Sequence, residues 1–312
     1  MELSIITVTW NSKNTIGRLI DSIPSAVFDP KTGRSLSYEH WVVDNASTDG
    51  AVEWLKEKYG TQTVDGQNMS SESFEFTGET IPRVRVWKNS KNEGFGAANN
   101  WAFHRASGDF ILFLNPDMKL EPESLFKACE WMWYHREVGI MAPKLVTETG
   151  EVNLNAGPRR FPTVWNQLAI VFKIPHLFPQ VLHQYLMKDF DYSKEQDVET
   201  VRGSYMLVRH DLLTKLGTAF DPRYFIWFED VDLCKEARKH GYKVVYNPAI
   251  QAVDYVGQSF NLRTTLWKQK NFTASMVKYF KKWGPWYAAF LVTLARPVGI
   301  VLAWVGDKVA KK

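Results

Sequence analysis

Polar side chains follow three apolar runs that have the composition of buried strands. Ligands of open α/β sheets bind at the carboxyl ends of the strands, so the residues just after such runs are the first candidates for a site. Asn115 and Asp117 follow residues 110–114, and one carboxylate therefore ends a buried strand. The strand-end candidates are Thr9, Trp10, Asn11, Asp44, Asn45, Asn115 and Asp117.

Asp117 has the chemistry of a metal ligand. A carboxylate at the end of a buried strand is costly unless a cation or hydrogen-bond donors compensate it. Mg²⁺ and Mn²⁺ prefer such oxygen ligands and bind through one or two carboxylates together with phosphate oxygens. The alternative is that Asp117 caps the helix that follows it.

A second acidic group, Glu229, Asp230 and Asp232, lies where a loop passes into a helix. The aromatic run 224–228 precedes it and includes Trp227. A general base beside an aromatic substrate platform has this arrangement. The acids could instead cap the helix and interact with its dipole.

The glycine-containing run 94–99 resembles a dinucleotide fingerprint, but Asn99 replaces the third glycine, and the run follows the third strand of the chain. Dinucleotide binding is therefore disfavoured. Gly94 at a helix start could still let a ligand approach free backbone N–H groups. A helix cap with a packing role is the alternative.

Apolar runs alternate with helical patterns, which predicts an α/β fold with a mostly parallel central sheet. The polar stretch 60–80 is expected to be a surface excursion without regular structure. The expected strands are residues 3–8, 40–44, 84–87, 110–114, 139–146, 201–208 and 244–246. The expected helices are residues 14–23, 51–59, 94–106, 123–136, 211–216 and 228–240.

The C-terminal segment 261–312 differs from the rest because it is apolar and aromatic with flanking lysines. About 20 apolar residues can span a bilayer. Arg296 and Pro297 lie in the middle of the run and argue against a simple span. We expect two short interfacial helices, with Pro297 in the first turn of the second. The aromatic stretch 161–185 could add to the same surface, and a helical pair packed on the rest of the protein is the alternative.

Composition limits the classes of function. The 312 residues carry 38 basic and 34 acidic side chains, so the net charge of +4 does not indicate nucleic-acid binding. Two cysteines cannot form a disulfide framework, and the N-terminus has no pattern of a secretory signal. We therefore expect a cytoplasmic protein, peripheral on the inner face of the cell membrane.

Five ordered motifs together resemble family 2 glycosyltransferases of the GT-A fold, closest to the rhamnosyltransferase branch of bacterial polysaccharide synthesis. They span roughly residues 3–260 and are the runs 4–11, 42–50, 92–99, 114–117 and 228–233. The resemblance implies that Thr9 and Asp44 contact the nucleotide base, that Asp117 holds the metal on the diphosphate, and that Asp230 is the catalytic base. Further substrate-binding residues that it implies are Trp10, Asn11, Asn45, Asn92, Gly94, Asn99, Asn115, Trp227 and Glu229.

Two positions depart from the family pattern. Asn115 replaces the first acid of the Asp-x-Asp motif, as it often does in this branch. Asp254 stands where family members commonly carry a histidine that can bind the metal. Aspartate is a harder ligand, so the site could persist with a preference for Mg²⁺ or Mn²⁺, or be lost.

The resemblance predicts a metal-dependent, inverting glycosyltransferase. The expected donor is a dTDP- or UDP-sugar, with dTDP-rhamnose first, and the expected acceptor is a glycan or a lipid-linked glycan. A sugar nucleotidyltransferase would need a glycine-rich first loop with Arg and Lys, which residues 9–13 do not supply. A non-catalytic membrane partner of a glycan-assembly complex is the other alternative. We expect a catalytic domain over residues 1–260, with donor and acceptor halves meeting near residue 118.

Overall fold

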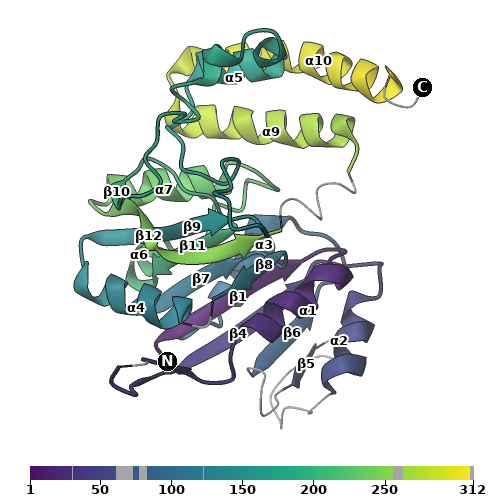
Figure 1. Cartoon of the computed structure of the whole chain (residues 1–312). Helices are drawn as coiled ribbons and strands as arrows, with labels where there is room; N and C mark the ends of the chain where they lie inside the picture. The colour runs from purple at the N-terminus through teal and green to yellow at the C-terminus, as the bar shows by residue number, and fades with distance from the viewer. Residues whose placement is uncertain (30, 61–72, 77–82, 122, 256–262, 310–312) are drawn as a thin grey trace.

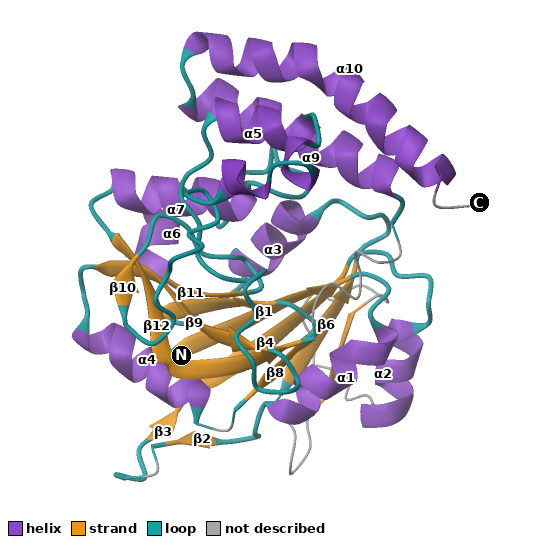
Figure 2. Cartoon of the chain, turned by 45° about the horizontal axis from the view of Figure 1, so that its top comes forward, coloured by secondary structure: helices purple, strands orange, loops and turns teal. Residues whose placement is uncertain are grey.

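The computed structural model describes residues 1–29, 31–60, 73–76, 83–121, 123–255 and 263–309. Figures 1 and 2 show a twisted central sheet with helices on both faces and a further helical layer at the C-terminal end of the chain. The site is positioned by the sheet and by the loops between the sheet and this outer layer.

Four parallel strands form the middle of the sheet, in the order β7 (Phe110–Leu114), β1 (Leu3–Thr9), β4 (Tyr38–Asp44) and β6 (Val84–Lys88). Antiparallel pairing of β7 with β11 (Tyr205–Arg209) extends this core toward the second half of the chain. The expected mostly parallel sheet is confirmed. The other strands of this sheet are β5 (Ser73–Phe76), β8 (Met118–Leu120), β9 (Val138–Val146), β10 (Gln196–Asp197) and β12 (Lys243–Asp254), and β2 (Val27–Phe28) pairs with β3 (Ser35–Leu36) separately.

Side chains alternate between the two faces of each strand, and each face has its own hydrophobic core. Leu3 and Ile5 of β1 pack in one core, and Ile6 and Val8 pack in the other. The first core takes side chains from α1 (Lys13–Ser22), α2 (Ala51–Tyr59) and α4 (Ser124–Tyr134). The second takes them from α3 (Phe95–Phe103), α6 (His210–Leu216) and α7 (Glu229–Lys239).

The outer layer consists of α5 (Val164–Val171), α9 (Thr265–Trp283) and α10 (Trp286–Val309), with two 3₁₀ turns, η1 (Ile174–His176) and η2 (Pro179–Leu182). Its core buries Met276 and Phe280 of α9 with Val292 of α10. Tyr224 and Phe228, which precede α7, belong to the same core. The outer layer therefore packs directly on the loop that leads to Asp230.

The prediction of a helix break at Pro297 is wrong. One helix, α10, runs through Pro297, and the break falls at Gly284 and Pro285 instead. The packing of α10 along α9 and α5 compensates for the hydrogen bond that Pro297 cannot donate. Arg296 is accommodated because its Nε donates to Thr273 Oγ1 of α9 at 3.1 Å.

Three predicted segments differ from the structure. The strand expected over 201–208 begins only at Tyr205, because residues 201–204 line a cavity. The short strand at 244–246 is part of the 12-residue β12, which tolerates Pro248 because the register shifts there. The excursion over 60–80 contains the strand β5, and its residues 61–72 and 77–80 lie outside the described residues.

Candidate active site

A cavity of about 320 Å³ lies where the strands β1, β4 and β7 end. Asn45 and Asn115, the residues after β4 and β7, line it, as the topology of a parallel sheet requires. Ten of the residues predicted from sequence share this cavity: Trp10, Asn45, Asn92, Gly94, Asn115, Asp117, Trp227, Glu229, Asp230 and Asp254. The sequence motifs therefore converge in one place.

Asn45 builds the wall of the cavity. Its Nδ2 donates to Asn92 Oδ1 at 3.0 Å and to the carbonyl oxygen of Gly94 at 3.1 Å. Its Oδ1 accepts from the backbone N–H of Glu93 at 3.0 Å and from Asn89 Nδ2 at 3.2 Å. With these four contacts, Asn45 holds the loop before α3 against the end of β4.

Four predicted residues do not line the cavity: Thr9, Asn11, Asp44 and Asn99. Asn99 Nδ2 donates to the carbonyl oxygen of Phe95 in its own helix. Asn11, at a φ of 50°, accepts from the backbone N–H of Thr48 at 2.8 Å. Both side chains are thus used in holding local structure.

Thr9 and Asp44 are fully buried at the paired ends of β1 and β4. Asp44 Oδ2 accepts from the backbone N–H of Ser47 at 3.0 Å, whereas Asp44 Oδ1 and Thr9 Oγ1 have no partner among the described residues. Burial raises the pKa of Asp44. A buried polar pair without partners is what a donor and acceptor on a ligand would satisfy.

The loop before the acidic group is strained. Trp227 has a φ angle of 65° and Phe228 one of 71°. Side chains larger than glycine rarely adopt such angles, and the strain persists only where the surroundings enforce it, most often at functional sites. Here Phe225 accepts from the backbone N–H of Phe95 at 2.8 Å, and a Cβ on Gly94 would lie 2.4 Å from the same carbonyl oxygen. The loop is therefore pinned against the start of α3.

Asp230, in the first turn of α7, is half-buried in the cavity wall. Its Oδ2 accepts from the backbone N–H of Gly203 at 3.2 Å, and its Oδ1 accepts from that of Val231 at 2.8 Å. These two bonds fix the orientation of a carboxylate that still has lone pairs available for a proton. The geometry is that of a positioned general base.

Glu229 is buried, and its Oε2 has no hydrogen-bond partner among the described residues. Burial, and then the charges of Asp230 and Asp232, raise its pKa well above 4.5. The shift favours the protonated form of the carboxyl group.

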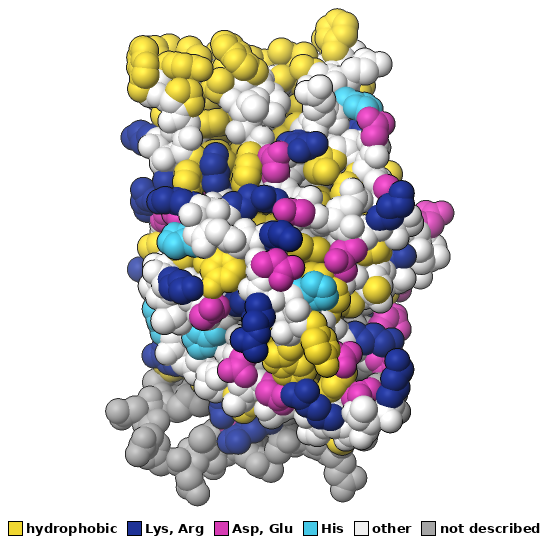
Figure 3. Space-filling model, turned by 90° about the vertical axis from the view of Figure 1, so that its left-hand side faces the viewer, with side chains coloured by type: hydrophobic (Ala, Val, Ile, Leu, Met, Phe, Trp, Pro, Cys, Tyr) yellow, Lys and Arg dark blue, Asp and Glu magenta, His cyan; other side chains and the backbone are white. Residues whose placement is uncertain are grey.

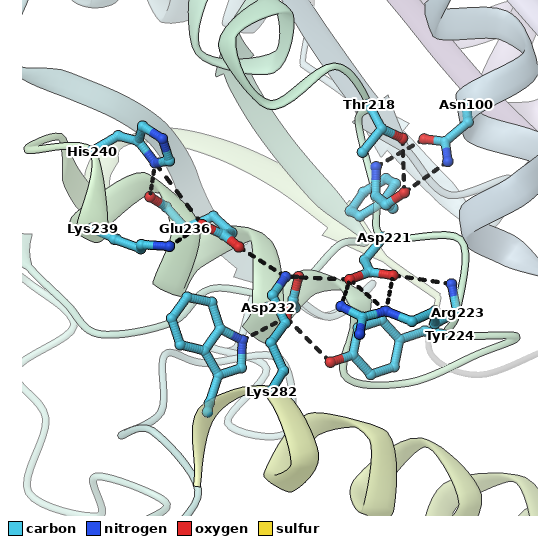
Figure 4. A network of polar contacts seen from close by, with 12 residues as sticks. Asn100, Thr218, Asp221, Arg223, Tyr224, Asp232, Glu236, Lys239, His240 and Lys282 are labelled. Carbon is cyan, nitrogen blue, oxygen red and sulfur yellow. Dashed lines mark hydrogen bonds and ion pairs between the residues drawn. The ribbon is translucent and has the colours of Figure 1, made fainter.

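Asp232 lies in a network of polar contacts between α7 and α9 (Figure 4). It accepts from Lys282 Nζ at 2.7 Å and from the indole Nε1 of Trp283 at 2.6 Å, both in the last turn of α9, and from the Tyr224 hydroxyl at 3.2 Å. Lys282 also contacts Asp221 at 3.2 Å and Glu236 at 2.8 Å. Asp232 does not line the cavity and anchors α7 to α9, which leaves Asp230 as the better candidate base.

Asp117 and Asp254 form the carboxylate pair of the cavity. Both are almost completely buried, and their backbones are adjacent because the N–H of Tyr255 donates to Asp117 O at 3.0 Å. Asn153 Nδ2 donates to Asp254 Oδ2 at 3.1 Å. The described residues contain no cluster of three or more His, Cys, Asp or Glu side chains suited to a metal. Two carboxylates fit an ion whose remaining ligands come from phosphate and water, as Mg²⁺ and Mn²⁺ prefer.

Three cations also line the cavity, Arg159, Arg202 and Arg263, and none of them was predicted because they belong to no recognisable motif. The Arg263 guanidinium stacks on two indole rings, 3.8 Å from the ring centroid of Trp10 and 4.6 Å from that of Trp267. Such cation–π contacts hold the guanidinium over the ring faces. The Arg202 side chain is exposed to solvent, and the surrounding protein and the charge of Arg159 lower its pKa against the charges of Asp230 and Asp254.

Comparisons with known proteins agree with this geometry. Residues 4–195, more than half of the chain, match the family model described as Glycosyl transferase family 2. Rhamnosyltransferase WbbL of Escherichia coli (strain K12) is 28% identical over 188 residues, which cover 57% of this chain and 68% of that protein. N-acetylglucosaminyl-diphospho-decaprenol L-rhamnosyltransferase of Mycobacterium tuberculosis is 24% identical over 282 residues, which cover 82% of this chain and 77% of that protein.

A solved structure matches nearly the whole chain. The mannosyltransferase PcManGT from Pyrobaculum calidifontis, in complex with GDP-Man and Mn²⁺, aligns with a TM-score of 0.52 at 16% identity, over 99% of this chain and 74% of that chain. At this identity the match concerns the fold.

Proposed function

The chain belongs to glycosyl transferase family 2 and has the GT-A fold, and from this premise we propose that it is an inverting glycosyltransferase with a nucleoside diphosphate sugar as donor. The observation that carries the proposal is the position of Asp230, which is held by two backbone N–H groups in the same cavity as Asp117 and Asp254. The reaction requires a base and a means of balancing the charge of the diphosphate, and Asp230 and the two carboxylates that would hold a metal ion lie in one cavity.

In the proposed reaction, Asp230 accepts the proton of an acceptor hydroxyl while that oxygen attacks the anomeric carbon. The new bond joins the acceptor oxygen to the anomeric carbon. The bond from that carbon to the phosphate oxygen breaks, and the nucleoside diphosphate leaves with the electron pair. One base suffices for this single displacement, and it inverts the anomeric configuration.

Asp117 and Asp254 are the proposed ligands of Mg²⁺ or Mn²⁺, and the mannosyltransferase named above, solved with Mn²⁺, supports this assignment. When bound, the ion would balance the charge of the leaving diphosphate. Thr9 and Asp44 are proposed to contact the nucleotide base, as the family resemblance implies. Each has a buried oxygen without a partner among the described residues, and the cavity would have to widen at the ends of β1 and β4 for a base to reach them.

The proposed sugar is rhamnose and the proposed role is cell-surface polysaccharide assembly, since two relatives carry rhamnosyltransferase names. One of those names specifies a diphospho-decaprenol acceptor, which supports a lipid-linked acceptor here. The donor would then be dTDP-rhamnose.

We further propose that the protein is peripheral on the inner face of the cell membrane. Within the described residues, one helical stretch, Trp286–Lys308, has the length and hydropathy to cross a membrane. Asp307, near its end, accepts from the backbone N–H groups of Thr265 and Leu266 at the start of α9. Because Arg296 also binds α9, α10 is tied along a lysine-containing helix, which favours lying in the interface over crossing it.

Thermal unfolding in the presence of UDP, dTDP and their sugars, with and without Mn²⁺, tests the site. Ligands that bind the folded state raise the midpoint. We expect a nucleoside diphosphate to raise the midpoint more with Mn²⁺ than without it, and Asp117→Ala to remove this metal-dependent increment. Asp109→Ala is the matched control, because Asp109 is exposed and does not line the cavity. An unchanged increment in Asp117→Ala contradicts the metal assignment.

A further inference from the structure

A second cavity of about 240 Å³ adjoins the active-site cavity. Arg159 and Tyr185 line both, so these two side chains form the boundary between them. No acidic residue lines it among the described part of the chain. We call it the side pocket, and its walls are Arg159, Ile170, Lys173, Pro175, His176, Leu182, Tyr185 and Leu186.

The side pocket contains two cations that have no carboxylate partner among the described residues. Lys173 Nζ donates to the neutral amide oxygen of Gln269 at 3.3 Å, and the Arg159 side chain donates to the backbone oxygen of Asn155. Within the described ranges, no carboxylate forms an ion pair with Arg159 or Lys173, whereas the neighbouring Arg160 pairs with Glu199 at 3.0 Å. Both unpaired side chains are half-buried, where an uncompensated charge is costly. An anion in the side pocket would balance them.

Most of the rest of the lining is aliphatic (Ile170, Pro175, Leu182 and Leu186), with the rings of His176 and Tyr185, and the surface beside the pocket is apolar as well. Phe172 and Ile174, on either side of Lys173, are exposed, and Leu177 and Phe178 are 78% and 64% exposed. α10, which packs on α5, adds an exposed stripe at intervals of about one helical turn: Trp286, Phe290, Leu294, Val298, Val301 and Val305. Figure 3 shows hydrophobic side chains gathered at the end of the molecule where α5 and α10 lie, with Lys and Arg side chains below them.

We propose that the side pocket binds the phosphate or diphosphate of a lipid-linked acceptor, with Arg159 and Lys173 as its anion-binding residues. This inference rests on the proposed glycosyl transfer. The hydrocarbon chain would lie along the apolar face of η1, η2 and α10, and the sugar would pass Tyr185 into the cavity that contains Asp230. An anion site with mostly aliphatic walls, beside an exposed apolar surface, matches the chemistry of a prenyl phosphate better than that of a soluble glycan.

The two anionic substrates then bind at separate ends. The donor diphosphate would bind beside the metal ion that Asp117 and Asp254 are proposed to hold, and the acceptor phosphate would bind at Arg159 and Lys173. Arg202 lines the active-site cavity and interacts electrostatically with both Arg159 and Asp230, so it lies in the region that joins the two ends. A cation at this junction reduces the repulsion between two phosphate-bearing substrates.

Binding of the full-length chain to vesicles tests the side pocket. The probes are phosphatidylcholine vesicles, the same vesicles with a polyprenyl phosphate, and the same vesicles with phosphatidylglycerol at equal charge. We expect the polyprenyl phosphate to increase affinity over phosphatidylglycerol. Arg159→Gln and Lys173→Gln should each lower that preference about tenfold, the value of one charge-assisted hydrogen bond. Lys188→Gln, at an exposed site on the same segment, should leave it unchanged.

Donor-induced thermal shifts with Mn²⁺, measured on every variant, separate this proposal from the proposed function. A normal donor shift with a lost lipid preference supports the side pocket, and a donor shift missing from the wild type contradicts the transferase instead. Equal binding of the two anionic vesicle types by the wild type, or a preference retained by both variants, overturns the side-pocket proposal. If Arg159→Gln fails to fold, Lys173→Gln decides.

Discussion

Lys282→Met should destabilise the protein more than any change to an exposed ion pair. Lys282 contacts Asp221 at 3.2 Å, Asp232 at 2.7 Å and Glu236 at 2.8 Å, and its side chain is 19% exposed, whereas that of Asp232 is 3% exposed. Removing one partner of a buried pair costs about 3–5 kcal/mol because the other charge is left uncompensated. Tyr224 and Trp283 still donate to Asp232 in the variant. We therefore expect the lower end, about 3 kcal/mol, or a fall in Tm of about 6 °C.

The pH dependence of this loss has a definite sign. Burial opposes the charge on Lys282, but hydrogen bonds to Asp232 and Glu236 outweigh it and raise the pKa of Lys282 above 10.5. The stabilisation that Lys282 provides is therefore fully present below the pKa of this lysine in the unfolded state and is lost as the pH rises through its pKa in the folded state. The difference in stability between wild type and Lys282→Met should thus shrink in strong alkali.

Urea unfolding at neutral pH measures the difference, with Lys127→Met as the control. Lys127 pairs with Glu123, and both side chains are half exposed. Loss of an exposed pair of this kind costs about 0.5 kcal/mol. If Lys282→Met unfolds within the error of Lys127→Met, the network does not anchor α7 to α9, and Asp232 regains its place as a rival base.

Asp230→Asn should keep donor binding and lower kcat by about 10²–10⁴, whereas the main effect of Asp232→Asn should be a lower Tm. Transfer assays and thermal unfolding of both variants test this, and the opposite pattern would exchange the roles of the two residues. Gly94→Ala should strongly lower Tm, since Gly94 has a φ of 92° and an added Cβ would lie 2.4 Å from the carbonyl oxygen of Phe225. A variant that folds and stays active would refute the claim that the loop is pinned against α3. Phe290→Glu with Leu294→Glu should release the chain from phosphatidylglycerol vesicles with an unchanged Tm, because both side chains are exposed, and retained sedimentation with the vesicles excludes α10 as the contact.

The middle of the fold could be predicted because local patterns determine it. Residues 110–114 are apolar, followed by polar Asn115 and Asp117, and a parallel sheet brings such strand ends to one edge. Residue types and spacing alone left Asp230 as one of three neighbouring acids, and the family resemblance selected it. The choice between Asp230 and Asp232 depends on Lys282, which is 50 residues away from Asp232 in sequence.

Contacts across long separations explain what the sequence could not supply. Asn45 matched a ligand-binding pattern, yet its side-chain amide forms hydrogen bonds with four residues that lie 44 to 49 positions later in the sequence. Nothing in the sequence around Arg159 and Arg202 distinguishes them from ordinary surface arginines, and only the folding of their loops over the sheet places them in one cavity. Pro297 has a strong local tendency to end a helix, which tertiary packing overrides.

The same long-range contacts join the C-terminal helices to the catalytic part. Trp267 and Phe272 of α9 line the active-site cavity, and Ser275 Oγ donates to the carbonyl oxygen of Ile226 at 2.7 Å, one residue before the strained Trp227. α9 therefore helps to enforce the backbone conformation that presents Asp230. The expected boundary near residue 260 lies outside the described residues, and a chain ending there would lack part of the cavity wall. Because α10 packs on α9, binding of α10 to a membrane would place the membrane next to the helix that supports the loop before Asp230.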